Sequence, residues 1–179
     1  QAILKNAPTR LIIYSDVNPG GDPEKYLRYF GIVYYREDDP STPTDEGGWL
    51  AATQGTYLPE GIYFDPEGGP SGGGNAWNGD TMTLDYPRTQ VGSNTSRTDG
   101  GGSDTYYYYE FESNGTMDQG SQNGWLVLRA GLLQPSGDDL EVVFPDEAPS
   151  IADKENLKAA LIFRRVGTTT MVTDPADID

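Results

Sequence analysis

The feature that most constrains the fold of this chain is a series of short segments rich in Tyr, Phe, Ile and Val, separated by Gly and Pro turn signals. In residues 105–118, "TYYYYEFESNGTMD", a β-prone run is followed by Asn114-Gly115, the strongest short-range hairpin signal. Residues 25–37, "KYLRYFGIVYYRE", carry apolar residues on both alternating faces and predict a strand covered on both sides. Such segments predict an antiparallel sheet or sandwich.

Helix is expected in only two places. Residues 1–14, "QAILKNAPTRLIIY", predict the end of an N-terminal helix or a first strand, with Pro8 opposing one unbroken helix. Ser150 followed by Asp153 resembles a capping box and predicts a short helix near residues 151–158. The acidic residues 174–179 are expected to form a frayed tail.

The length of 179 residues allows one substantial core, so we predict a single globular domain spanning residues 1–179. Its expected class is mainly β with an α+β arrangement, in which a short N-terminal helix stub packs on an antiparallel β-sheet or sandwich.

Charge and composition exclude several classes of function. The formal net charge of −16 makes nucleic acid and anionic lipid surfaces unsuitable partners, because the surface repels phosphate groups. The sequence contains no His and no Cys, which excludes Ser-His-Asp and Cys-His nucleophiles, thiolate zinc sites and disulfides. Carboxylates, Tyr, Lys and Arg are the residues left for chemistry.

Residues 15–30, "SDVNPGGDPEKYLRYF", raise the question of a calcium loop. Asp16, Asn18 and Asp22 occupy positions 1, 3 and 7 of such a loop, but Gly and Leu stand at positions 5 and 12, where an EF-hand has ligands. A turn leading into a strand is therefore the favoured interpretation, and no metal or cofactor is expected. An irregular calcium site that uses Asp16, Asp22 and Glu24 is the alternative.

Two further features are candidates for binding or catalysis. Glu110 and Glu112 lie on one face of a predicted strand, a pattern that a glycosidase can use, although a solvated strand face explains it more simply. Trp77 lies in a Gly-rich region and is the aromatic residue that we expect at the surface, which makes it a candidate partner or ligand contact.

The order of several segments resembles that of a known family. "RLIIYSD", "YLRYFGIVYY", "LPEGIYF", "YYYYEFESNGT" and "ALIFRRVGTTTMV" follow one another as in the soluble part of type IV pilin-like proteins, and they look most like the H-type minor pseudopilins of type II secretion. Leu58-Pro59-Glu60-Gly61 matches the family's Leu-Pro-x-Gly turn, and Gly167 matches a short Gly turn in its last hairpin.

This resemblance implies a non-enzymatic structural subunit of a pilus or pseudopilus. Its partners would be other pilin or pseudopilin subunits, and it would be extracytoplasmic, anchored in the inner membrane by a helix preceding Gln1. The alternative from a different class is a secreted carbohydrate-binding β-sandwich module, in which aromatic and acidic residues hold a glycan. A third hypothesis is a glycan hydrolase that uses Glu110 and Glu112.

Overall fold

The structure is a computed structural model that describes residues 2–17, 21–37, 47–69, 80–90, 101–117, 124–144, 158–174 and 177–178. It is all-β, with antiparallel sheets and a half-barrel. The strands are β1 Thr9–Tyr14, β2 Tyr29–Arg36, β3 Gly48–Ala51, β4 Thr56–Tyr57, β5 Ile62–Asp65, β6 Thr81–Thr83, β7 Thr105–Phe111, β8 Gly124–Ala130, β9 Leu132–Ser136, β10 Asp139–Val143, β11 Lys158–Phe163 and β12 Thr169–Val172.

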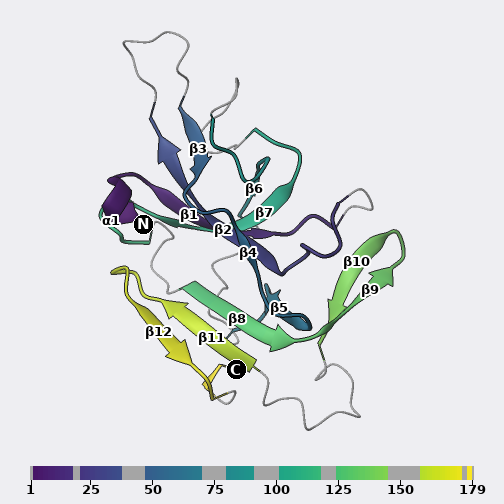
Figure 1. Ribbon diagram of the computed structural model, residues 1–179. Coiled ribbons are helices and arrows are strands. Elements are labelled where there is room, and N and C mark those ends of the chain that lie inside the picture. Colours follow the sequence, from purple (N-terminus) through teal and green to yellow (C-terminus); the bar gives the residue numbers. More distant parts are fainter. Residues whose placement is uncertain are drawn as a thin grey trace.

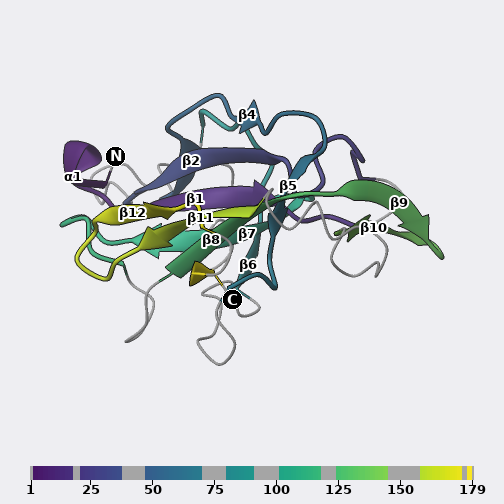
Figure 2. The same cartoon turned by 90° about the horizontal axis from the view of Figure 1, so that it is seen from below.

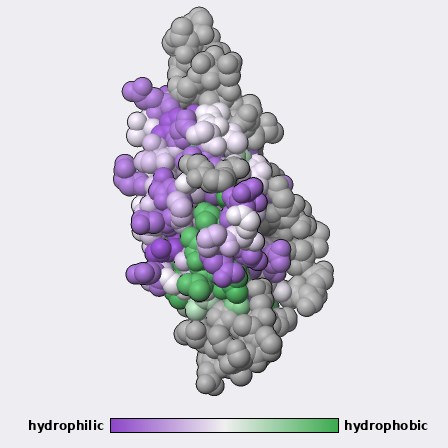
Figure 3. Space-filling model, turned by 90° about the vertical axis from the view of Figure 1, so that its right-hand side faces the viewer, coloured by the Kyte–Doolittle hydropathy of each residue, from purple (hydrophilic) through white to green (hydrophobic). Residues whose placement is uncertain are grey.

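These strands form three sheets (Figure 1). A six-stranded sheet has the order β3-β2-β1-β7-β6, with β4 paired to β2, and a four-stranded sheet has the order β12-β11-β8-β5. The third sheet is the β9–β10 hairpin, which projects from one end of the molecule (Figure 2). On the side that carries this hairpin, a patch of hydrophobic residues has hydrophilic residues on both its sides (Figure 3).

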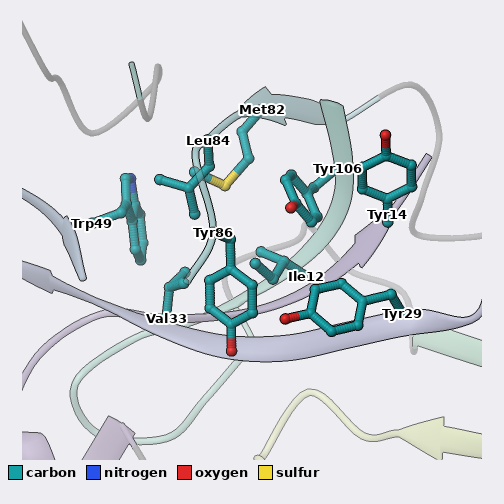
Figure 4. Packing of buried hydrophobic residues seen from close by; sticks show 9 residues of the cluster. All are labelled: Ile12, Tyr14, Tyr29, Val33, Trp49, Met82, Leu84, Tyr86 and Tyr106. Atoms are coloured by element: carbon teal, nitrogen blue, oxygen red, sulfur yellow. The ribbon is translucent and has the colours of Figure 1, made fainter. Parts of the chain in front are cut away.

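Strand β1 lies at the centre of the larger sheet, and its alternating side chains enter two different cores. Leu11 and Ile13 pack with Phe64 and Phe163 of the four-stranded sheet. Ile12 belongs to a second cluster on the other face. The buried members of this second cluster are Ile12, Tyr14, Tyr29, Val33, Trp49, Met82, Leu84, Tyr86 and Tyr106 (Figure 4). Burial on both faces explains why the strands of this sheet are apolar and aromatic throughout.

The outer face of the four-stranded sheet is covered in part by the end of the chain. Ile178 is fully buried with Val127 of β8 and Ala160 of β11. This residue lies within the segment 174–179 for which the sequence suggests fraying.

The predicted pilin-like α+β fold is wrong, because the described N-terminal residues contain only the four-residue helical turn α1, Ala2–Lys5. Asn6 ends this turn in the left-handed region at φ 50°, and the amide of Ala7 donates to the carbonyl of Ala2 at 3.3 Å. Both features are typical of a Schellman helix end. Pro8 follows and the chain enters β1 at Thr9, so no helix stub packs on the sheet as predicted.

The second predicted helix, near residues 151–158, lies outside the described residues except for Lys158, with which β11 begins. In the part of the chain that the structure describes, no helix has the length and apolar character needed to cross a membrane.

Candidate functional site

A cavity of about 450 Å³, which we call the polar pocket, lies where β5, β8 and the β9–β10 hairpin meet residues 26–27. Its wall combines a buried apolar part with charged and hydroxyl groups. The apolar part includes Leu27, Val142 and Phe144, all buried. The polar side chains in the lining are Tyr26, Asp65, Glu67, Arg129, Glu141 and Lys158.

An ion pair between Asp65 and Arg129 anchors the pocket. Asp65 ends β5 opposite Val127 of β8, so Arg129 is its diagonal neighbour on the same face. Nη1 of Arg129 lies 2.8 Å from Oδ2 of Asp65, and the side chains are 12% and 4% exposed, respectively. The other carboxylate oxygen, Oδ1, accepts hydrogen bonds from the amides of Glu67 at 3.0 Å and Gly68 at 2.8 Å. One carboxylate therefore fixes both the turn after β5 and the guanidinium of β8.

Gly68 is required for this turn by close packing. A Cβ atom at this position would lie 2.7 Å from Oδ2 of Asp65 and 2.9 Å from Cβ of Val127. On the opposite side of the pocket, the guanidinium of Arg129 stacks over the ring of Phe144, 4.3 Å from its centroid. The charged centre of the pocket is thus held rigidly between β5, β8 and the residue that follows β10.

The backbone at Leu27 positions Tyr26 in the pocket wall. Leu27 adopts φ 51°, a left-handed conformation that costs about 1–2 kcal/mol for a side chain of this type. The amide of Leu27 donates to the carbonyl of Tyr14 at 3.0 Å, and its carbonyl accepts from the amide of Phe64 at 2.8 Å. Strands β1 and β5 therefore hold the strained residue in place. Strain of this kind is often found at functional sites.

The hydroxyl of Tyr26 is available to a ligand. It hydrogen-bonds to none of the described residues. Burial raises the pKa of Tyr26 to about 12, and the neighbouring Tyr107, Glu141 and Asp139 add to the shift. At neutral pH the phenol is protonated and can donate a hydrogen bond.

Charged residues of both signs line the same pocket as Tyr26. Glu67 and Glu141 are exposed, and neither carboxylate pairs with a cation among the residues that the structure describes. Lys158 of β11 lies directly opposite Arg129 of β8, which places two cations side by side on neighbouring strands. The pocket therefore offers both donors and acceptors of hydrogen bonds beside an apolar wall.

The structure does not bring the predicted carboxylate pair into a cleft. Glu110 is 4% exposed and lies in the core, where its Oε2 accepts from Arg10 Nε at 2.9 Å and from Nη2 at 2.7 Å. Glu112 follows the end of β7, and its amide donates to the carbonyl of Thr116 at 2.8 Å. A carboxylate held in a buried ion pair is not placed to protonate a glycosidic oxygen.

The calcium candidates are distributed around a turn. Oδ1 of Asp22 caps the amide of Glu24 at 3.1 Å, and Oδ2 lies 3.6 Å from Nζ of Lys25. Asp16 is buried at the end of β1. Within the described ranges, no group of three or more Asp, Glu, His or Cys side chains is placed to hold a metal ion.

Trp77, the predicted surface contact, lies outside the described residues. Sequence reasoning missed the polar pocket, because its residues come from five separate segments whose register is not visible in the sequence. A local signal existed only at "FDPEGG" (64–69), where a carboxylate between a strand and a Gly pair is typical of a capped turn.

A second cavity, of about 280 Å³, lies at the other end of the two larger sheets. Its lining residues are Ala2, Thr9, Leu11, Ile32, Phe111, Asn114, Gly115, Val166 and Gly167. This lining contains no ionisable side chain, so it offers no side-chain acid or base for catalysis.

The sequence matches no protein-family model, and neither the curated proteins nor the solved structures give a match. Together with the all-β fold, this result overturns the resemblance to pilin-like proteins. The predictions of assembly with pilin subunits, of membrane anchoring and of an extracytoplasmic location were drawn from that resemblance and lose this support.

Proposed function

We propose that this protein is a non-enzymatic carbohydrate-binding β module whose ligand site is the polar pocket. One observation carries the proposal: Tyr26, Glu67 and Glu141 line one cavity, and none of their side chains forms a hydrogen bond or ion pair with a described residue.

A sugar suits this combination of groups. Its hydroxyls donate to carboxylates and accept from phenols, lysines and guanidinium groups, while its C–H surface packs on apolar side chains. The lining carries both cations, such as Lys158, and anions, such as Glu141, so it favours a neutral polar ligand over an ion. The volume of about 450 Å³ lies within the range of small-molecule sites.

The pocket is also preformed, which favours binding. The ion pair between Asp65 and Arg129 and the strained backbone at Leu27 hold the wall without a ligand. A ligand therefore does not have to order these groups when it binds, and less binding energy is lost.

Isothermal titration calorimetry tests the proposal with a panel of neutral oligosaccharides of glucose, mannose, galactose and N-acetylglucosamine. We expect Tyr26→Phe and Glu141→Gln each to weaken binding of the preferred sugar about three- to tenfold, as loss of one hydrogen bond predicts. Tyr57→Phe and Glu60→Gln are matched controls, because both residues are exposed and lie outside the pocket.

The controls are expected to bind like the wild type. Binding that is insensitive to both pocket variants, or no binding to any member of the panel, would contradict the proposal. Thermal unfolding of each variant separates loss of binding from loss of fold.

A further inference from the structure

Two hairpins at opposite ends of the molecule carry opposite charge. The turn between β11 and β12 bears Arg164 and Arg165, both exposed. Asp138 lies in the turn between β9 and β10, and Asp139 beside it is the first residue of β10; both are exposed. Figures 1 and 2 both place these turns at the two ends of the same axis, so they cannot meet within one copy of the chain.

None of these four charged side chains pairs with another described residue. Three other cations lie beside carboxylates: Arg10 and Arg129 form ion pairs with buried carboxylates, and Lys25 lies 3.6 Å from Asp22. The chain has a net charge of −16, so two adjacent exposed cations that pair with no described carboxylate contrast with its overall acidity. Their best electrostatic partner is an exposed acidic surface.

Exposed apolar side chains lie on both hairpins, with Val166 in the β11–β12 turn and Leu132 at the end of β9 that is far from Asp138. Four large hydrophobic residues among those described are well exposed, and three of them, Leu132, Val166 and Met171, lie on these two hairpins or in their turns. Their exposed fractions are 68%, 73% and 66%. Figure 3 shows a hydrophobic patch with hydrophilic borders on the side that carries β9 and β10. Patches of this composition are typical of protein interfaces.

The backbone at both places is open to pairing. β12 is the last strand of its sheet, and β9 and β10 pair only with each other among the described strands. Unpaired strand edges readily accept a strand from another chain. A two-stranded hairpin also gains stability when a further strand or surface packs on it.

We propose that the protein self-associates head to tail: the acidic β9–β10 hairpin of one copy docks on the basic β11–β12 hairpin of a second copy. The contact joins two different surfaces, so each added copy exposes the next docking site and the assembly can extend. Asp138, Asp139, Arg164 and Arg165 do not line the polar pocket, so the docking contact uses the two turns and not the residues of the proposed sugar site.

Sedimentation velocity of the full chain tests self-association up to about 1 mM, the range needed for a weak contact. An ionic strength of about 0.15 M limits the general repulsion between acidic copies to about 8 Å. We expect the average mass of the wild type to rise with concentration above that of one chain.

Charge exchange identifies the surfaces. R164E/R165E and D138R/D139R are each expected to weaken self-association at least about tenfold. The fourfold variant R164E/R165E/D138R/D139R exchanges both turns, keeps the net charge of the wild type and is expected to restore self-association. D138R/D139R is the sharpest case, because it lowers the net negative charge and would associate more strongly if only general repulsion mattered.

A wild type that stays monomeric at the highest concentration would overturn the proposal. So would self-association that R164E/R165E leaves unchanged, or a fourfold variant that stays monomeric while its thermal unfolding matches that of the wild type. All four positions are exposed, so the substitutions are expected to preserve the fold.

Discussion

The guanidinium of Arg10 and the carboxylate of Glu110 form a buried ion pair across the central strands β1 and β7. The two residues are direct neighbours in the register, and both side chains are buried. The guanidinium carbon lies 4.2 Å from the ring centroid of Trp49 and 3.8 Å from that of Tyr108. The aromatic rings therefore stabilise the cation while the carboxylate neutralises it.

Glu110→Gln is expected to lower the free energy of unfolding by about 3–5 kcal/mol, because it leaves Arg10 charged and unpaired in the core. Urea unfolding followed by circular dichroism measures the change, with Glu60→Gln as the exposed control. The double variant Arg10→Met/Glu110→Met should lose less stability than Glu110→Gln, since it buries no unpaired charge. A larger loss in the double variant would contradict this account.

Gly167→Ala is expected to be strongly destabilising. Gly167 adopts φ 81°, and a Cβ atom there would lie 2.1 Å from the carbonyl oxygen of Gly115. Gly137→Ala provides the control, because it has φ 65° but no atom within 4 Å of the added Cβ. The control should cost about 1–2 kcal/mol through backbone strain alone. Thermal unfolding should show a greater loss for Gly167→Ala, and equal losses would argue against contact between the two turns.

Tyr106→Phe is expected to raise the free energy of unfolding by about 1 kcal/mol. The hydroxyl of Tyr106 is completely buried and bonds to no described residue, so its removal relieves a desolvation cost. Tyr86→Phe should act in the opposite sense, because that hydroxyl donates to the carbonyl of Thr53 at 2.7 Å. Denaturant midpoints of the two variants compare these effects directly. Destabilisation by Tyr106→Phe would indicate that its hydroxyl has a partner.

Stability is expected to fall as the pH rises above about 10, the ordinary pKa of tyrosine. Burial raises the pKa of Tyr26 to about 12 and also raises the pKa values of Tyr86, Tyr106 and Tyr107. Above pH 10 the unfolded chain loses phenolic protons that the folded chain keeps, so unfolding becomes more favourable. Midpoints of urea unfolding between pH 8 and 12 measure this loss, and a constant midpoint across that range would contradict it.

The sequence predicts those parts of the fold that depend on residues close together in the chain, such as turns and single strands. Asn114-Gly115 predicts a hairpin, and β7 ends at Phe111, which pairs with Met117 across a turn with Gly115 at φ 85°. The apolar run at residues 25–37 predicts a doubly covered strand, and β2 lies within a sheet with buried clusters on both faces. Turn chemistry and alternation are encoded by neighbouring residues.

The wrong prediction of a pilin-like fold has local causes. The segment 1–14 predicts the end of a helix or a first strand, but Asn6 and Pro8 end the helical turn after Lys5. The resemblance to pilin-like proteins rests on the order of short apolar segments, and many β proteins share such segments.

The candidate site escaped sequence reasoning because it depends on contacts between residues far apart in the sequence. Asp65 and Arg129 are 64 residues apart, and only the register of β5 on β8 makes them partners. Glu110 appeared exposed because its partner, Arg10, lies 100 residues away. Two carboxylates on one face of a predicted strand therefore do not show whether they form a catalytic pair or whether one of them is held in a buried ion pair.

The most direct test of the proposed function is an NMR titration of the isotope-labelled protein with the oligosaccharide that binds most tightly in the panel. We predict that the largest amide shifts fall on the polar pocket, at Tyr26, Glu67 and Glu141, while Tyr57 and the β11–β12 turn stay unchanged. Shifts confined to residues outside the pocket, or no shift with any sugar, would contradict the assignment of this pocket as a carbohydrate site.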